Sequence, residues 1–141
     1  MSELTSMTDG EQAKRYIQQF EQYLSPTLTD KNIDMAQYAK KLFTYGKIIA
    51  YQEKGIIGYY LDQKEKKCFI SILSVTPEYQ SQGIGGYLIK QAESDAKKNQ
   101  LTCIQLAVEK ENSGGIRFYE RHGFSYLNET NSQYLYIKKI G

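Results

Sequence analysis

Apolar residues recur at helical spacing through the first third of the chain. One such set predicts a helix over about residues 9–24; its members are Ala13, Tyr16, Ile17, Phe20, Tyr23 and Leu24. Thr8 and Glu11 have the spacing of a capping box, with Thr8 as the N-cap, and Ser25-Pro26 is expected to end the helix. A second helix is predicted over about residues 30–45, stopped by Gly46.

Beyond Gly46 the pattern changes to runs that are typical of strands, interrupted by two helices. Strands are predicted at about 47–52, 56–61, 68–76, 101–108, 124–128 and 133–140, and helices at about 85–98 and 112–121. The order ααββ-βαβαββ predicts an α/β protein with a mixed sheet and helices on its faces. The strand at 68–76, the helix after it and the strand at 101–108 form the expected right-handed parallel crossover.

Length and composition narrow the class of protein. The 141 residues fit one domain, 1–141, and 40% hydrophobic with 24% charged residues is ordinary for a globular chain. The net charge is only +2 and the basic residues form no stripe, so no nucleic-acid partner is expected. There is one histidine and there are two isolated cysteines, so no metal site is expected.

The chain shows no sign of a membrane or export segment. No apolar run approaches the roughly 20 residues that span a bilayer, and residues 1–10 are polar and lack the apolar core of a signal peptide. A cytoplasmic protein without a membrane partner is therefore expected.

A glycine-rich loop between the 68–76 strand and the helix that follows carries the clearest chemical signal. Gly83, Gly85 and Gly86 allow tight bending and close approach of a ligand, and the unpaired amides at a helix start favour phosphate. A plain glycine turn remains an alternative. A Walker loop is absent. A dinucleotide fingerprint would need glycine at position 88, where this chain has leucine, and an acidic residue closer to the glycines than Glu109. An NAD(P) binder is thus weakened but left open.

Two motifs here resemble the GNAT superfamily of N-acetyltransferases. Residues 80–85, Gln-Ser-Gln-Gly-Ile-Gly, are similar to its coenzyme A loop [QR]-x-x-G-x-[GA], with the lead-in Val-Thr-Pro-Glu-Tyr at 75–79. Residues 112–124 are similar to its N-x-x-A-x-x-F-Y-x-x-x-G-F motif, with Gly115 in place of the customary alanine. The resemblance covers about residues 68–126 and implies a GNAT-like fold with splayed central strands. It implies acetyl-coenzyme A as co-substrate, and a homodimer is plausible for such a protein.

The resemblance also assigns residues to the cofactor. Main-chain amides should hold the coenzyme A pyrophosphate in a cradle made of Gln80, Ser81, Gln82, Gly83, Ile84, Gly85 and Gly86. The main chain of Leu73, Ser74 and Val75 should bind the pantetheine arm as an added strand. Asn112 is expected to contact the pantetheine or to act as a helix N-cap, or both. Tyr119 is expected to donate a proton or a hydrogen bond to the departing thiolate, with a core aromatic as its alternative role.

The sequence departs from the family in two places. The usual first strand is not evident, so the sheet is expected either to begin with the 47–61 hairpin or to hold only a brief edge strand near the N-terminus. Many relatives place a glutamate on the central strand as general base, but residues 68–74 contain no carboxylate. Glu78, Glu109, Asp62 and a water chain remain as candidate bases.

The acceptor is the least determined part of the reaction. The connection 25–32, the first hairpin and the 128–133 turn are expected to wall its site, together with a tyrosine-rich surface made of Tyr45, Tyr51, Tyr59, Tyr60, Tyr134 and Tyr136. These surroundings suit a primary amine of a small molecule, an amino sugar or a peptide. Transfer should be direct from acetyl-coenzyme A to the amine. A non-catalytic acyl-coenzyme A-binding regulatory module is the alternative to the enzyme.

Overall fold

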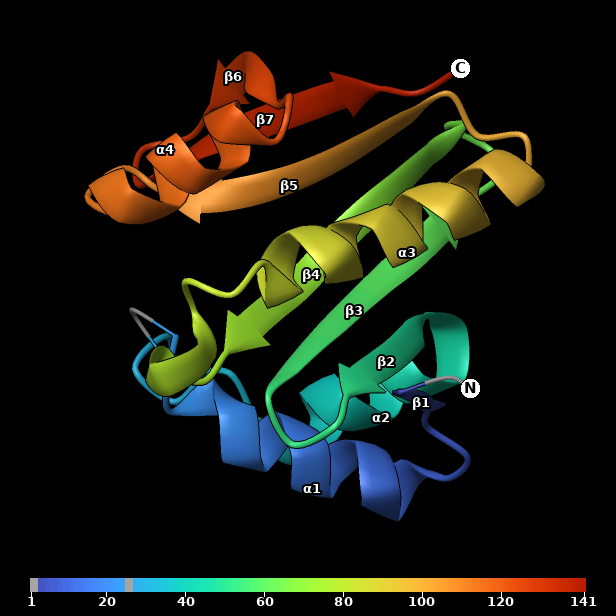
Figure 1. Ribbon diagram of the computed structural model, residues 1–141, viewed down its shortest axis with the longest axis vertical. Coiled ribbons are helices and arrows are strands. Elements are labelled where there is room, and N and C mark those ends of the chain that lie inside the picture. The colour runs from blue at the N-terminus through green and yellow to red at the C-terminus, as the bar shows by residue number, and fades with distance from the viewer. Residues whose placement is uncertain (1–2, 25–26) are drawn as a thin grey trace.

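The computed structural model describes residues 3–24 and 27–141 (Figure 1). Its elements are β1 Leu4–Ser6, α1 Gly10–Glu21, α2 Met35–Tyr45, β2 Lys47–Tyr51, β3 Gly55–Asp62, β4 Lys67–Val75, a short 3₁₀ turn Pro77–Tyr79, α3 Ile84–Lys98, β5 Cys103–Glu109, α4 Ser113–Arg121, β6 Ser125–Glu129 and β7 Gln133–Lys139. The predicted order of helices and strands is confirmed, and the short β1 and the 3₁₀ turn are added to it.

The strands form one seven-stranded sheet in the order β1-β2-β3-β4-β5-β7-β6. Only β4 and β5 run parallel, joined by the predicted crossover through α3; every other pair is antiparallel. The helices α1 and α2 cover one face of the sheet, and α3 and α4 cover the other (Figure 1). The mixed α/β class is therefore confirmed.

The first helix starts one residue later than the predicted cap implies. The Asp9 carboxylate, not the Thr8 hydroxyl, caps α1 by accepting from the Gln12 amide at 2.8 Å. Oε1 of Gln12 reaches back and accepts from the Thr8 amide at 2.8 Å, so a reciprocal arrangement like a capping box forms one residue before the cap. The prediction of Thr8 and Glu11 was wrong because Asp9 is the stronger N-cap residue. Helix α1 ends at Glu21, and the predicted stop at Ser25-Pro26 lies outside the described residues.

The second helix is shorter than predicted. It begins at Met35, where the Asp34 carboxylate accepts from the Gln37 amide at 3.0 Å. Residues 28–33 form turns instead, with the Ile33 amide donating to the Leu28 carbonyl at 3.0 Å. The connection 27–34 is thus an ordered loop that reaches the open end of β4. Of the two alternatives for the N-terminus, the structure shows the brief edge strand, because β1 pairs with β2.

An irregularity in β4 separates two parts of the strand. Gly58 pairs with Ile72 and Tyr59 with Ile70, so Ser71 is the extra residue of a β-bulge. Cys68 and Ile70 belong to the core under α3, whereas Ile72 belongs to the core under α1 and α2. The extra residue shifts the alternation of side chains between faces.

The same irregularity marks the point where β4 leaves β5. The parallel pairing runs from Lys67 with Cys103 to Ile70 with Leu106 and goes no further. Beyond it, residues 71–75 of β4 and 107–109 of β5 diverge, and the sheet opens between them (Figure 1). The splayed central strands implied by the resemblance are confirmed.

Within the described ranges, no helix combines the length and apolar character needed to cross a bilayer.

Candidate active site

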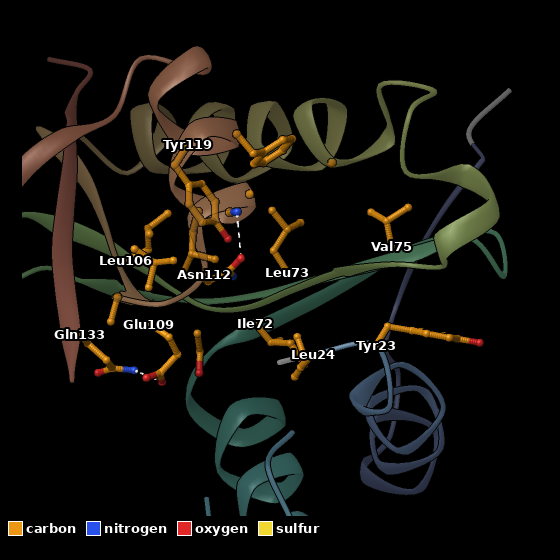
Figure 2. A pocket seen from close by; sticks show the side chains of 18 of the residues that line it. Tyr23, Leu24, Ile72, Leu73, Val75, Leu106, Glu109, Asn112, Tyr119 and Gln133 are labelled. Carbon is orange, nitrogen blue, oxygen red and sulfur yellow. Dashed lines mark hydrogen bonds between the residues drawn. The ribbon is translucent and has the colours of Figure 1, made fainter. Parts of the chain in front are cut away.

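A cavity of about 540 Å³ occupies the opening between β4 and β5. Its walls come from the diverging ends of both strands, the start of α3, the helix α4 and the connection after α1 (Figure 2). Leu73 and Val75 line it on the β4 side, and Asn112 and Tyr119 project into it from the α4 side. The site therefore exists because the strands stop pairing at Ile70.

The main chain before α3 presents a group of unpaired hydrogen-bond donors. The amides of Gln80 and Gln82 are used within the loop, donating to Pro77 and Tyr79 carbonyls at 3.3 and 3.2 Å. The amides of Ser81, Gly83, Ile84, Gly85 and Gly86 donate to no acceptor within residues 3–24 and 27–141. These free amides sit at the positive end of a 15-residue helix, which is a site suited to a phosphate group.

The three glycines of the loop serve different purposes. Gly83 has φ of 81°, a left-handed conformation that glycine adopts freely, while a Cβ there would meet nothing within 4 Å. A Cβ on Gly85 would lie 2.9 Å from Cζ of Phe118, and one on Gly86 would lie 2.6 Å from Nε2 of His122. Gly85 and Gly86 therefore allow α3 to pack closely on α4, which holds the loop and Tyr119 in one unit.

Tyr119 provides a neutral hydroxyl at the cavity wall. Its ring packs edge-on against Phe118 and Phe124, at centroid distances of 5.3 and 5.8 Å. Burial raises the pKa of Tyr119 to about 12. Its hydroxyl has no hydrogen-bond partner among the described residues, so it stays protonated and free to donate to a group in the cavity.

Asn112 is the N-cap of α4, as one of its two predicted roles required. Its Oδ1 accepts from the Gly115 amide at 2.9 Å, drawn as a dashed line in Figure 2. A Cβ on Gly115 would lie 2.5 Å from Nδ2 of Asn112, so the glycine at this position leaves room for the capping side chain. Asn112 also lines the cavity, and its contact with a ligand stays a prediction.

Glu109 places a carboxylate at the opposite side of the cavity from the glycine loop. It ends β5, and its Oε1 accepts from Nε2 of Gln133 at 3.0 Å (Figure 2). Nζ of Lys31 lies 3.7 Å from the same oxygen. Glu109 is the only carboxylate among the described residues that line the cavity.

The other candidate bases lie elsewhere. The Asp62 carboxylate accepts from the amides of Lys64 and Glu65 in the β3–β4 turn, at the end of β4 remote from the opening. Glu78 is exposed on the 3₁₀ turn and does not line the cavity. Among the carboxylates predicted, only Glu109 lines the cavity.

The structure brings part of the predicted cofactor set together at the cavity. The predicted residues that line it are Leu73, Val75, Gln80, Gly85, Asn112 and Tyr119. The remaining predicted residues do not line the cavity and lie in the adjoining loop and the first turn of α3; they are Ser81, Gln82, Gly83, Ile84 and Gly86. Ser74 points its side chain to the other face, where its hydroxyl donates to the Phe20 carbonyl at 2.9 Å.

The wall predicted for the acceptor is correct in two segments and wrong for the hairpin and the tyrosines. None of the tyrosines at 45, 51, 59, 60, 134 and 136 lines this cavity, and the first hairpin does not reach it. Leu28 and Lys31 of the predicted connection and Gln133 at the end of the predicted turn do line the cavity, and Tyr23 and Leu24 after α1 are added to them. The hairpin pairs with β4 along its whole length, so its side chains stay on the closed side of that strand.

Ser71 was missed as a site residue, and Lys31 and Gln133 were covered only by the predicted wall segments 25–32 and 128–133. The unpredicted bulge brings Ser71 to the cavity, where its hydroxyl lies 2.6 Å from that of Tyr38. The sequence placed Gln133 at the end of a predicted turn without marking it as a site residue, and no local signal marks Lys31. Within the described ranges, no group of three or more histidine, cysteine or acidic side chains could hold a metal ion.

Comparisons with known proteins agree with this geometry. The model of the Acetyltransferase (GNAT) family matches residues 11–124. A spermidine N(1)-acetyltransferase of Thermoplasma acidophilum is 31% identical over 91 residues, which is 64% of this chain and 56% of the relative. An uncharacterized N-acetyltransferase of Methanocaldococcus jannaschii is 33% identical over 78 residues, or 55% of this chain and 34% of the relative. The matched segments thus span about a third to about half of these relatives.

The fold has solved counterparts as well. The PaiA N-acetyltransferase of Thermoplasma acidophilum, crystallised with coenzyme A, superposes with a TM-score of 0.73 at 19% identity, over 99% of both chains. The family match covers most of the chain and includes both motifs and the strands that open around the cavity. The chain is therefore a member of the GNAT family of acetyltransferases.

Proposed function

We propose that the protein is an acetyl-coenzyme A-dependent N-acetyltransferase that transfers the acetyl group directly to a primary amine. One observation supports it above the others: a single cavity is bordered by a neutral tyrosine hydroxyl, a carboxylate and the glycine loop with its free amides. A module that only binds the cofactor has no need for the hydroxyl and the carboxylate to face the same space.

The glycine loop and the free edge of β4 would hold the cofactor. The unpaired amides of Ser81, Gly83, Ile84, Gly85 and Gly86 would donate hydrogen bonds to the pyrophosphate oxygens. The Thr76 amide donates to the Lys54 carbonyl on the β3 side at 2.9 Å. Because successive amides of an extended strand point to opposite edges, the Val75 and Leu73 amides point toward the opening and can pair with the pantetheine arm. The main chain of Ser74 faces β3 by the same alternation.

The transfer itself would use three groups of this chain. The acceptor nitrogen attacks the thioester carbon and gives its proton to Glu109, directly or through water. The oxyanion that forms is stabilised by the Val75 amide at the open edge. The carbon–sulfur bond then breaks, and the Tyr119 hydroxyl donates to the departing thiolate sulfur. Holding both reactants in one cavity supplies the proximity that such a direct transfer needs.

The geometry of Glu109 suits the role of base. Its described partners, Gln133 and Lys31, both approach Oε1, and Oε2 accepts no hydrogen bond from any residue in the described ranges. One oxygen is thus held in place and the other is open to the acceptor. A spermidine acetyltransferase among the relatives supports a small cationic amine as acceptor, since a carboxylate attracts an ammonium group.

Thiol release from acetyl-coenzyme A, measured against a panel of amines, tests this function. The panel should hold polyamines, amino sugars and peptides with free N-termini. Turnover on at least one amine, with the N-acetylated product identified by mass spectrometry, is the expected result. Tight binding of acetyl-coenzyme A without turnover on any class of amine would contradict the proposal and favour the regulatory module.

A further inference from the structure

One lysine of the chain already occupies the acceptor side of the cavity. Lys31 lies in the connection 27–34, its side chain lines the cavity, and its Nζ is 3.7 Å from Oε1 of Glu109. Among the residues described, no other lysine lines this cavity. The Lys31 side chain is 37% exposed and that of Glu109 is 22% exposed, so solvent reaches both members of the pair at the edge of the cavity.

The backbone around Lys31 fixes where the side chain begins. The Lys31 amide donates to the Thr27 and Leu28 carbonyls at 3.2 and 3.1 Å, and Leu28 is buried in the core under α1. The Thr29 amide donates to the Glu21 carboxylate at 3.0 Å, which ties the connection to the end of α1. The lysine stem is therefore anchored beside the cavity, while its four-carbon chain leaves Nζ free to swing within it.

An amine at this place stands where the acceptor amine would stand. If Glu109 is the base for the acceptor, any primary amine in contact with Glu109 is a candidate nucleophile. Lys31 carries such an amine, and it is the same chemical group as the end of an alkyl polyamine or a lysine side chain. The geometry makes Lys31 either a competitor of the acceptor or an acceptor itself.

We propose that Lys31 is an internal acceptor, so that the protein acetylates its own Lys31 from bound acetyl-coenzyme A. This inference rests on the proposed acetyltransferase function. The Lys31 ammonium first loses one proton to solvent. The neutral Nζ then attacks the thioester carbon and passes a second proton to Glu109, while a carbon–nitrogen bond forms and the carbon–sulfur bond breaks. The thiolate of coenzyme A leaves and takes a proton from Tyr119 or from solvent. The products are Nζ-acetyl-Lys31 and free coenzyme A, and no oxidant or reductant is involved.

Acetylation would change the site as well as mark it. An acetylated lysine has no positive charge, so the contact between Lys31 and Glu109 loses its attraction. Glu109 would then keep Gln133 as its partner and be open to an external amine. Self-acetylation would therefore convert the site from one that holds its own lysine to one that is free for an acceptor.

Lys47 offers a matched control in the same molecule. It also pairs with a carboxylate, with Nζ 3.2 Å from Oδ2 of Asp95, but it lies outside the cavity between β4 and β5. Its side chain is 55% exposed, more than that of Lys31. Non-enzymatic acetylation by acetyl-coenzyme A should modify Lys47 at least as fast as Lys31, whereas catalysis at the site should favour Lys31.

The experiment follows both lysines by peptide mass spectrometry while purified protein reacts with acetyl-coenzyme A. Lys31 is expected to react at least about tenfold faster than Lys47, at a rate independent of protein concentration, as intramolecular reactions do. Excess free coenzyme A should suppress the reaction of Lys31 and leave that of Lys47 unchanged. The variant Tyr119→Phe should slow only Lys31, and Lys31→Arg should remove the modification.

Two results would overturn the inference. Equal modification of both lysines, insensitive to free coenzyme A, would show chemical acetylation without catalysis. Turnover on external amines with Lys31 unmodified would reject the internal acceptor and leave the proposed function standing. Failure of the function itself is distinguishable, because then neither external amines nor Lys31 would be acetylated.

Discussion

The β4–β5 pair has a closed half, in which residues 67–70 pair with 103–106, and an open half, made of residues 71–75 and 107–109. The two halves differ in what they contribute to the protein. In the closed half, Cys68 and Ile70 lie beside Ile104 and Leu106, all nearly inaccessible in the core beneath α3. In the open half, the strands separate and their ends border a cavity. The bulge at Ser71 lies at the boundary between the two halves, directly after the last β4–β5 pair, Ile70 with Leu106. Side-chain packing in the closed half therefore stabilises the fold, and the open half provides the walls of the candidate site.

The closed half should respond to truncation by losing stability. Ile104→Ala removes a fully buried side chain and should lower the free energy of unfolding by about 3 kcal/mol. Leu73→Ala, in the open half, is the matched variant and should cost clearly less, because Leu73 is only partly buried. Urea unfolding of both variants measures this. Equal losses would contradict the division between the halves.

Tyr119 should matter for chemistry more than for binding. Tyr119→Phe keeps the ring packing and removes the hydroxyl, so kcat should fall by about 100-fold while the Kd for acetyl-coenzyme A changes little. Tyr136→Phe is the control: its hydroxyl donates to Glu120 at 2.9 Å outside the cavity. Steady-state kinetics with calorimetric binding separate the two effects. Parallel losses of kcat and affinity in Tyr119→Phe would point to a packing role.

Glu109 should carry the proton transfer at the acceptor side. Glu109→Gln keeps the shape and removes the base, so kcat should fall by about 30-fold or more at neutral pH. The loss should shrink as pH rises and more of the acceptor amine loses its proton in solution. Glu93→Gln is the control, because Glu93 pairs with Lys138 at 3.4 Å away from the cavity. A pH–rate profile of Glu109→Gln parallel to that of the wild type would reject Glu109 as base.

Two substitutions at Gly83 should separate the effect of a negative charge on cofactor binding from the effect of side-chain shape. Gly83 has left-handed backbone geometry and open space around its Cβ position, so Asn and Asp meet the same steric surroundings there. Gly83→Asp adds a negative charge beside the expected pyrophosphate and should bind acetyl-coenzyme A about tenfold more weakly than Gly83→Asn. Titration calorimetry compares the two variants. Equal affinities would place the pyrophosphate elsewhere.

Alkaline pH should affect stability through buried tyrosines on both sides of the sheet. Burial raises the pKa of Tyr119 and that of Tyr38 to about 12. The unfolded chain ionises these phenols near pH 10, so it releases protons first. The stability that they contribute is full below about pH 10 and is lost as pH rises toward about 12. Urea midpoints across this range should fall, and the fall should be smaller in Tyr119→Phe.

The sequence predicted those parts of the site that depend on local pattern. The loop at 80–86 and the capping role of Asn112 could be read directly, because glycine spacing and cap chemistry are encoded within a few residues. The assignment of Tyr119 came through a motif of the same short range. The bulge at Ser71 could not be predicted, because it depends on the register between β3 and β4, which no local pattern fixes.

The acceptor side was predicted only in part, for a related reason. Lys31, Gln133 and Glu109 come from three separate segments that meet only in the folded chain. The tyrosines predicted to line the site were chosen by abundance, and the register placed them on other surfaces. A cytoplasmic location and a homodimer stay predictions.

The most direct test of the account is titration calorimetry of acetyl-coenzyme A into the wild-type protein. Saturable binding at one site per chain is expected, weakened in Gly83→Asp and retained in Tyr119→Phe. Absence of binding by the wild-type protein would contradict the central claim, because the open half of β4–β5 and the free amides of the loop would then have no cofactor to hold.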